Sequence, residues 1–334
     1  MQRDKVLHQP PELAVDAFDY DLIAWGIATG RGFVRDSRST EFQQPYLARN
    51  PSLKFTSIAG PATDRPPLYP VLLAATFWAG RQFQLIRIIQ ALFLGLVATA
   101  VAQRVMRCAG LIPALLSMGL FLIVDPRPRT MTSEILTESM SCMLVMVLYL
   151  VLISWDSQQR TRDVLIAGFV FGLLVLCRSM MILWLPVLGI WTWRLKGRLP
   201  RWSIAKPFFI FVSITVAVCL PWWIRNVQVL GEFRPLGSQG AEQLSAAYSD
   251  GAFSRMGMWF SLDATGFFEE NNDIDPVKRI LARVNHSEQQ AKRWVCQHPF
   301  KAAALWPLRI LQEFRPHGPG DLFILAFATL GLAS

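Results

Sequence analysis

The chain has 334 residues, of which 52% are hydrophobic and only 17% are charged, and its formal net charge is +9. Soluble domains carry roughly 25% charged residues, so this composition argues against an ordinary soluble protein. The positive charge does not indicate nucleic-acid binding. Many basic residues stand in short links between apolar blocks, as in the cytoplasmic loops of membrane proteins.

The first 80 residues are mostly polar and predict an external loop with two interfacial helices. One short amphipathic helix is expected at about 19–28, ended by Gly30, and the chain from there to residue 65 is expected to be loop. The second helix is expected at 66–80, which is apolar but short and opens with several prolines. A span needs about 20 apolar residues, so residues 66–80 are expected to lie at the interface or to re-enter rather than cross.

Residues 81–224 hold the apolar blocks that predict a transmembrane core. Six spans are expected, at about 86–105, 109–124, 138–154, 163–177, 179–193 and 206–224. Residues 225–320 are polar and mixed and predict a second external segment, and 321–334 predict a truncated span. The expected fold is therefore all-α, a polytopic membrane helical bundle with interfacial helices in its first external loop.

Basic residues in the short links predict how the chain is oriented. The link 194–206 has five Lys or Arg and no acid, so it is expected in the cytoplasm. Alternation of the spans then places 104–108 and 155–163 on the same side, and 16–65, 125–137 and 225–320 outside. An external start without a preceding span also leads to the expectation that a first helix is missing from this sequence.

Acidic residues are densest in Asp16, Asp19 and Asp21. On a helix Asp16 shares a face with Asp19 and with Tyr20. Carboxylates just outside a membrane can act as a general base or hold a divalent metal ion, so these three aspartates are also the metal candidates. The alternative is a solvated helix start, where acids are favoured by the helix dipole.

Four arginines and one glutamate stand at expected membrane boundaries or inside apolar stretches. Arg65 and Arg225 lie at the interface, where each is either an anchor or a phosphate ligand. Arg87 and Arg178 interrupt apolar stretches, where charge is functional by default unless the side chain snorkels to water. Glu138 begins a span and needs a partner or a cavity.

The order of several short motifs resembles polyprenyl-phosphate-dependent glycosyltransferases of the GT-C superfamily, most of all the bacterial protein-mannosyltransferase and aminoarabinose-transferase type. The motifs are Asp16-x3-Tyr20-x3-Ala24, Gly30-x-Gly32-Phe33, Arg65-Pro66-Pro67-Leu68-Tyr69-Pro70, Leu136-Thr137-Glu138, Arg178 and Pro221-Trp222-x2-Arg225-Asn226. The likeness runs from about residue 16 to 240. The family's first helix and its C-terminal spans have no counterpart.

The resemblance implies transfer of a sugar, with inversion, from a polyprenyl-phosphate donor to a lipid, glycan or protein acceptor on the external face of the plasma (inner) membrane. Asp16 matches the family's catalytic aspartate, the general base. The expected substrate-binding residues are Tyr20, Arg65, Tyr69, Arg87, Glu138, Arg178 and Arg225. Some relatives use a divalent metal ion and others do not.

A polytopic transporter is the alternative function. A transporter is expected to show inverted repeats and charges near the bilayer midplane. This sequence has no internal repeat, and its charges gather at one expected face. A non-catalytic scaffold is a third reading, but it would not need Asp16 and the arginines to converge.

Overall fold

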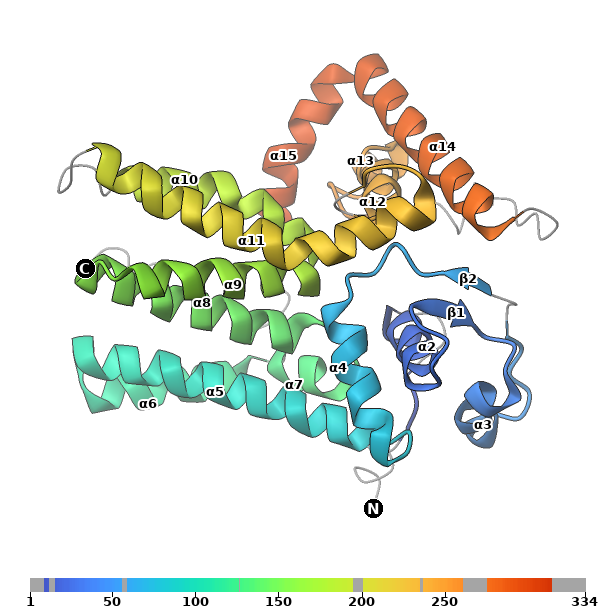
Figure 1. Cartoon of the computed structure of the whole chain (residues 1–334), viewed down its shortest axis with the longest axis horizontal. Helices are drawn as coiled ribbons and strands as arrows, with labels where there is room; N and C mark the ends of the chain where they lie inside the picture. The colour runs from blue at the N-terminus through green and yellow to red at the C-terminus, as the bar shows by residue number, and fades with distance from the viewer. Residues whose placement is uncertain are drawn as a thin grey trace. The chain divides into compact units, whose positions relative to one another are not determined.

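The computed structural model describes residues 9–11, 16–55, 59–125, 127–194, 201–234, 237–260 and 275–313 (Figure 1). This part of the chain is mostly helical and includes a two-stranded sheet. The chain divides into two compact units, residues 1–228 and 229–334, and each is described by itself. The expected truncated span at 321–334 and part of the expected cytoplasmic link 194–206 lie outside the described residues.

The first unit begins with helix α2 (Asp16–Ala28), which carries two acids in its first turn, where the helix dipole favours negative charge. The chain continues through β1 (Val34–Asp36), α3 (Thr40–Arg49) and β2 (Ala59–Pro61). The two strands pair antiparallel, with Arg35 opposite Gly60. Strand β1 lies against α2, because a Cβ added at Gly26 would be 2.7 Å from the carbonyl oxygen of Val34.

The prediction of a loop between residues 30 and 65 is wrong where β1, α3 and β2 form. Helix α3 begins after Ser39, whose hydroxyl accepts a hydrogen bond from the Phe42 amide. It buries Phe42 and Tyr46 against Phe18 of α2 in an aromatic cluster. Long-range packing against α2 therefore stabilises a helix that carries little apolar periodicity of its own.

Helix α4 (Leu68–Thr76) follows the two prolines at 66–67 and continues into a 3-10 turn, η1 (Phe77–Ala79). Nine helical residues rise only about 14 Å, roughly half of a bilayer's hydrocarbon thickness. Tyr69 and Leu73 of α4 are fully buried. Helix α4 packs beside α2, so the two helices expected in the first external loop lie together.

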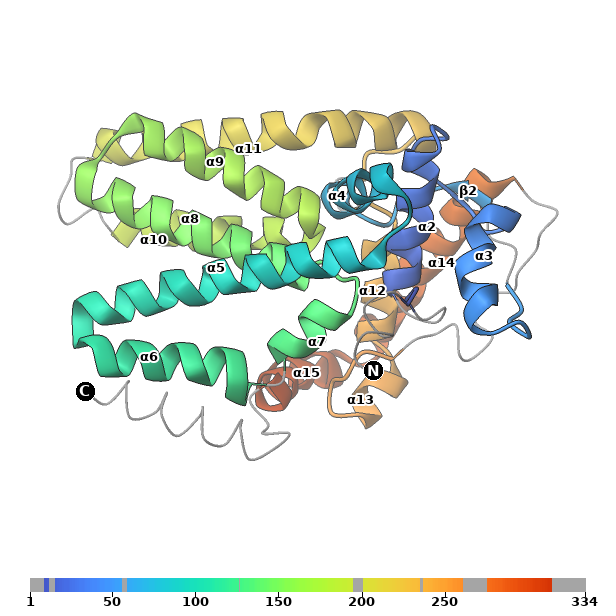
Figure 2. The same ribbon diagram turned by 90° about the horizontal axis from the view of Figure 1, so that it is seen from below.

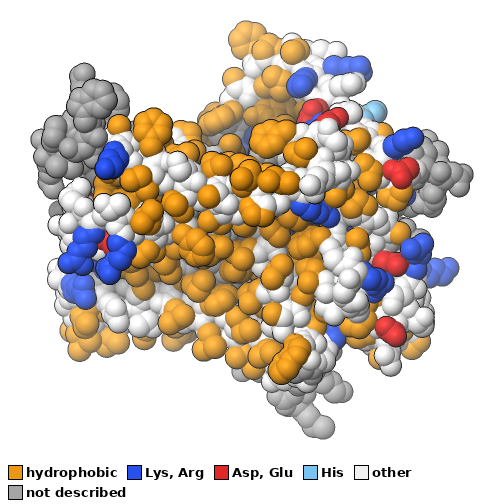
Figure 3. Space-filling model, in the orientation of Figure 1, with side chains coloured by type: hydrophobic (Ala, Val, Ile, Leu, Met, Phe, Trp, Pro, Cys, Tyr) orange, Lys and Arg blue, Asp and Glu red, His pale blue; other side chains and the backbone are white. Residues whose placement is uncertain are grey.

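Within the described residues, three helices are long and apolar enough to cross a membrane: α5 (Phe83–Ala109), α8 (Glu138–Gln158) and α11 (Arg201–Leu230), the last over its residues 205–230. At most 33% of the most apolar stretch of each is buried within the chain. Hydrophobic side chains accordingly cover much of the helical face in Figure 3. Such exposure is costly in water and favourable in lipid.

The remaining apolar blocks form shorter helices, so the sequence's six expected spans are matched at full length by only these three. Helix α6 (Leu111–Gly119) continues through a π-helical turn, η2 (Leu120–Val124), and is bent by 51° from α7 (Arg127–Ser133). Helix α9 (Thr161–Cys177) has 17 residues, and α10 (Leu185–Arg194) follows a 3-10 segment, η3 (Ser179–Trp184). The bent pair of α6 and α7 would count as one further crossing.

Helices α9 and α11 approach each other closely at two glycines. A Cβ at Gly168 would lie 2.7 Å from the carbonyl oxygen of Phe211, and one at Gly172 would lie 2.7 Å from Val218 Cβ. The Thr215 hydroxyl donates to the Gly168 carbonyl at 3.1 Å. Small residues one turn apart with a crossing hydroxyl are typical of helix packing in membranes. Figures 1 and 2 both show α5, α8, α9 and α11 side by side.

The described part of the second unit contains four helices: α12 (Gln239–Ala247), α13 (Asp250–Ser254), α14 (Pro276–Gln297) and α15 (Pro299–Glu313). Asp275 caps α14, accepting hydrogen bonds from two amides of its first turn. Trp294 of α14 and Leu305 of α15 form its apolar core. This helical unit occupies most of the segment expected to be polar and external.

Candidate functional site

Asp16 and Arg65 form an ion pair at the start of α2. Asp16 Oδ1 lies 2.7 Å from Arg65 Nη2, although 49 positions separate the two residues. The Asp16 side chain is 58% exposed, whereas that of Arg65 is 9% exposed. The β1–β2 hairpin ends just before Arg65 and returns the chain to α2. A solvent-facing carboxylate therefore touches a buried guanidinium group.

Two further carboxylates hold Arg65 from its buried side. Asp19 Oδ2 lies 2.9 Å from Arg65 Nη2, and Asp64 Oδ2 lies 3.6 Å from Nε. Arg35 of β1 pairs with Asp64 and lies 3.6 Å from Asp19. Burial raises the pKa of Asp64, but the nearby guanidinium groups outweigh burial and hold this pKa below its ordinary value. Three acids thus meet two arginines, and Asp16 is the most exposed of the acids.

Tyr20 lies beneath this ion network. The Arg65 guanidinium carbon is 5.4 Å from the centre of the Tyr20 ring, and the ring meets Tyr69 edge to face at 5.1 Å. Burial raises the pKa of Tyr20 to about 12, with a smaller rise from Asp16. Tyr20 is therefore a neutral hydroxyl at physiological pH, and it reaches Thr137 at the start of α8.

Glu138 and Arg178 bring two more elements to the same place. Arg178 caps the C-terminal end of α9, and its Nη1 donates to Glu138 Oε1 at 3.1 Å. Glu138 begins α8 beside Thr137 and acts electrostatically on Tyr20. The Arg178 side chain is 44% exposed. We call Asp16, Tyr20, Arg65, Glu138 and Arg178 the acid–arginine cluster.

Tyr69 is joined to the cluster through a buried amide that the sequence did not single out. Its hydroxyl donates to Gln90 Oε1, and Gln90 Nε2 donates to the carbonyls of Met131 and Glu134 at 2.9 and 2.7 Å. Arg87, expected to bind substrate, instead donates to the carbonyls of Ser133 and Gln9. Arg87 and Gln90 of α5 therefore both fasten the end of α7, and Gln90 also fastens the residue that follows it.

A metal site would require the carboxylates of Asp16, Asp19 and Asp21 to lie together, and the Asp21 carboxylate lies elsewhere. Its carboxylate is fully buried, accepts from Tyr46 Oη at 2.5 Å and pairs with Arg81. Five aromatic rings lie within 6 Å of the Arg81 guanidinium. Among the described residues no three His, Cys, Asp or Glu side chains are grouped to hold a metal ion. Asp16, Asp19 and Asp21, the candidate metal ligands of the sequence, are therefore not grouped as one metal site.

Arg225, the last expected substrate residue, contacts the hairpin rather than the acid–arginine cluster. Its guanidinium donates to the carbonyls of Ala62 and Phe33 at 2.6 and 2.9 Å. It also lies over the Trp222 ring at 4.9 Å. Arg225 thus fastens α11 to the segment that delivers Arg35 and Arg65.

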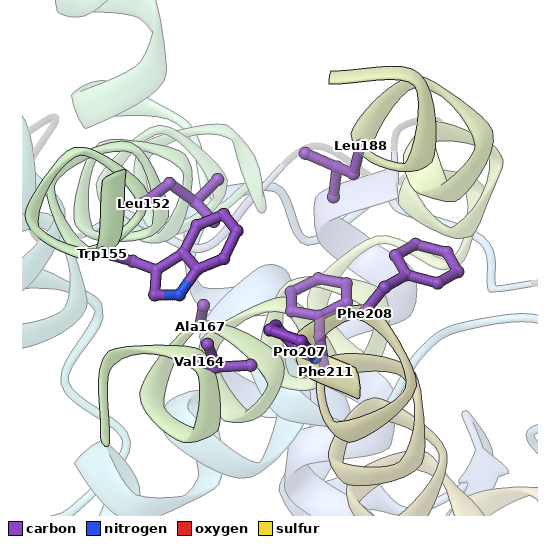
Figure 4. A pocket seen from close by; sticks show the side chains of 8 residues that line it. All are labelled: Leu152, Trp155, Val164, Ala167, Leu188, Pro207, Phe208 and Phe211. Atoms are coloured by element: carbon purple, nitrogen blue, oxygen red, sulfur yellow. The ribbon is translucent and has the colours of Figure 1, made fainter. Parts of the chain in front are cut away.

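An apolar pocket lies at the other end of the helices, between α8, α9, α10 and α11 (Figure 4). Trp155, Val164 and Phe211 are among its lining residues. Along α8, Trp155 is about 25 Å from Glu138. The lining side chains of this pocket offer no acid or base, so it takes no part in the chemistry of the cluster.

Sequence reasoning missed Arg35, Asp64, Gln90 and Arg81. Asp64 stands next to Arg65, which is a weak local signal. The partners of Arg35, Gln90 and Arg81 lie on other elements, and the residues next to them in the sequence give no sign of these contacts.

Comparisons of the chain with protein-family models, with curated proteins and with solved structures find no match.

Proposed function

We propose that this protein is a membrane glycosyltransferase that moves a sugar from a polyprenyl-phosphate donor to an acceptor at the external membrane face. The observation that carries the proposal is the contact between the exposed Asp16 carboxylate and the buried Arg65 guanidinium. The motif order that resembles the GT-C glycosyltransferases supports it independently. The donor is a lipid, so a site beside apolar helices suits it.

The proposed reaction is a single inverting displacement. Asp16 accepts the proton of the acceptor hydroxyl or amine, and the acceptor atom forms its bond to the anomeric carbon. The bond between that carbon and the phosphate oxygen breaks, and polyprenyl phosphate leaves with the electron pair. Guanidinium groups stabilise the charge that develops on the leaving phosphate.

Two arginines are suited to the phosphate. Arg178 is half-exposed, and within the described residues its one ion pair is with Glu138, so its remaining donors can reach a ligand. Arg65 is the second, and a phosphate that binds it would weaken its contact with Asp16. Binding of the donor would thus release the Asp16 carboxylate from Arg65, so that it can act as the base. The Asp19 and Asp64 carboxylates would keep Arg65 in place during this exchange.

The proposed setting is a polytopic bundle in the plasma (inner) membrane, with α2 and α4 at the external interface. The side chains of Asp21, Arg81 and Arg87 are buried and Arg225 is partly buried against the β1–β2 hairpin, so we assign these four residues a positioning role. No specific observation favours the transporter alternative, because the acid–arginine cluster lies at the ends of α8 and α9 rather than at mid-helix.

The test is transfer by the full chain in proteoliposomes that contain polyprenyl-phosphate mannose or aminoarabinose as donor and a membrane extract as acceptor. Asp16→Asn is expected to lower turnover by at least about 100-fold, the contribution of a positioned general base. Arg178→Gln is expected to raise the apparent KM for the donor.

The matched control is Asp36→Asn, which removes a carboxylate of the same hairpin that pairs only with surface arginines in the described structure. Its turnover should equal that of the wild type. Equal turnover of Asp16→Asn and wild type would remove Asp16 from the mechanism. A wild-type protein inactive with both donors and all acceptors would overturn the glycosyltransferase proposal.

A further inference from the structure

A polar groove lies between α5 and α8, at the end of these helices opposite to the acid–arginine cluster. Its volume is about 310 Å³. The two helices pack against each other, and both are long and apolar enough to cross a membrane. The groove lies within their last turns, at the level where a bilayer's headgroups meet the ends of a span.

Each helix presents one face to the groove. Helix α5 contributes Ala100, Gln103, Arg104 and Arg107, and α8 contributes Leu150, Ile153, Ser154, Ser157 and Gln158. On both helices these positions recur with the three- and four-residue spacing of a single face. The lining also changes along the helices. Ala100, Leu150 and Ile153 lie toward mid-membrane, and the arginines and amides lie toward the helix ends.

The charge of the groove is positive and unneutralised. Its lining contains two arginines and no acid. Within the part of the chain that the structure describes, no hydrogen bond or ion pair involves the side chain of Arg104 or Arg107. Asp163 contacts one lining residue, because it accepts from the Ser154 hydroxyl at 2.9 Å, and it lies near Arg162. The two guanidinium groups therefore remain available to an anion.

We infer that this groove binds an anionic phospholipid, with the headgroup phosphate held by Arg104 and Arg107. The gradient from apolar to basic lining matches a lipid whose acyl chains point to mid-membrane and whose phosphate lies at the surface. From Leu150 to Gln158 the groove follows α8 for about 12 Å. A free phosphate ion would use the arginines but leave the apolar end empty. This site is independent of the proposed sugar transfer.

The test measures lipid binding to the purified full chain by native mass spectrometry, with phosphatidylglycerol titrated against phosphatidylcholine. The wild type is expected to prefer phosphatidylglycerol. The double variant Arg104→Gln/Arg107→Gln is expected to lose about 30-fold in affinity for it, since each basic residue near an anionic headgroup contributes roughly a factor of five. Millimolar inorganic phosphate is expected not to displace the lipid.

The matched control is Arg160→Gln/Arg162→Gln, which removes the same charge from the start of α9 without changing a residue that lines the groove. If both double variants weakened binding equally, the effect would be general surface charge and the site would be refuted. Equal affinity for the two lipids would refute it as well. Ser157→Glu places a carboxylate in the groove and keeps both arginines, so it must also weaken lipid binding. This variant tests the site if the double variant does not fold.

Discussion

Asp16 and Asp21 stand on the same helix, yet their carboxylates have opposite surroundings. Asp16 faces solvent beside Arg65, whereas Asp21 is enclosed by Tyr46 and Arg81. An exposed acid can exchange protons with a substrate. A buried, paired acid can only hold elements together, and its removal leaves an uncompensated charge. At the scale of single residues, the degree of burial therefore distinguishes Asp16, the candidate base, from Asp21, the structural acid.

Replacing Arg81 by Ala is expected to destabilise the first unit by about 3–5 kcal/mol, because the Asp21 carboxylate would stay buried without its partner. Tyr46→Phe removes one hydrogen bond to the same carboxylate and should cost only about 1 kcal/mol. Thermal unfolding in detergent measures both changes. If Arg81→Ala were no more destabilising than Tyr46→Phe, the ion pair would not hold α2 to the turn between η1 and α5.

Asp64 makes stability depend on pH. Its pKa in the folded chain lies below the ordinary value of about 3.9, so its contribution is complete above that pH and is lost as the pH falls through the folded pKa. The midpoint of thermal unfolding is therefore expected to drop more between pH 6 and pH 3 in the wild type than in Asp64→Asn. The exposed control, Asp156→Asn, should follow the wild type. Parallel curves for wild type and Asp64→Asn would contradict this reading.

At the scale of elements, the structure depends on contacts that join short segments. The β1–β2 hairpin is fastened to α11 by Arg225, and the end of α7 with the residue after it is fastened to α5 by Gln90. No pattern in the local sequence predicts either contact. The hairpin and helix α3 were missed because three-residue strands are too short to show alternation, and α3 is anchored by only two large side chains.

The close approach of α9 and α11 predicts the effect of a small substitution. Gly168→Ala is expected to destabilise the chain by about 1–3 kcal/mol, because the added methyl would meet backbone rather than a movable side chain. Gly95→Ala in α5 has open space around its Cβ and should be neutral or slightly stabilising. Thermal unfolding of both variants in one detergent compares them. Equal stability would mean that α9 and α11 do not pack as described.

At the scale of the whole molecule, the expected orientation rests on the basic residues of the links. Two native cysteines can report it. Cys108 lies in the last turn of α5, within an expected cytoplasmic link, and Cys296 lies in the expected external segment. Both are exposed. The other three cysteines are buried or partly buried.

A membrane-impermeant maleimide is therefore expected to label Cys296 in intact cells and Cys108 only after permeabilisation. Mass spectrometry identifies the labelled site, and the variants Cys108→Ser and Cys296→Ser confirm each assignment. Labelling of Cys108 from outside would reverse the orientation, place Asp16 in the cytoplasm and remove the basis for transfer from an external lipid-linked donor.

Local sequence alone reveals the helical class and the longest apolar helices, because an apolar run of sufficient length needs no partner to become a helix in lipid. It also singles out Asp16, Arg65 and Arg178 as charged residues near an expected membrane boundary. Which acid meets which arginine is decided by tertiary structure. The β1–β2 hairpin returns Asp64 and Arg65 to α2, and an ion pair between residues 49 positions apart depends on that path rather than on neighbouring residues. For the same reason only the folded chain separates the exposed Asp16 from the buried Asp21.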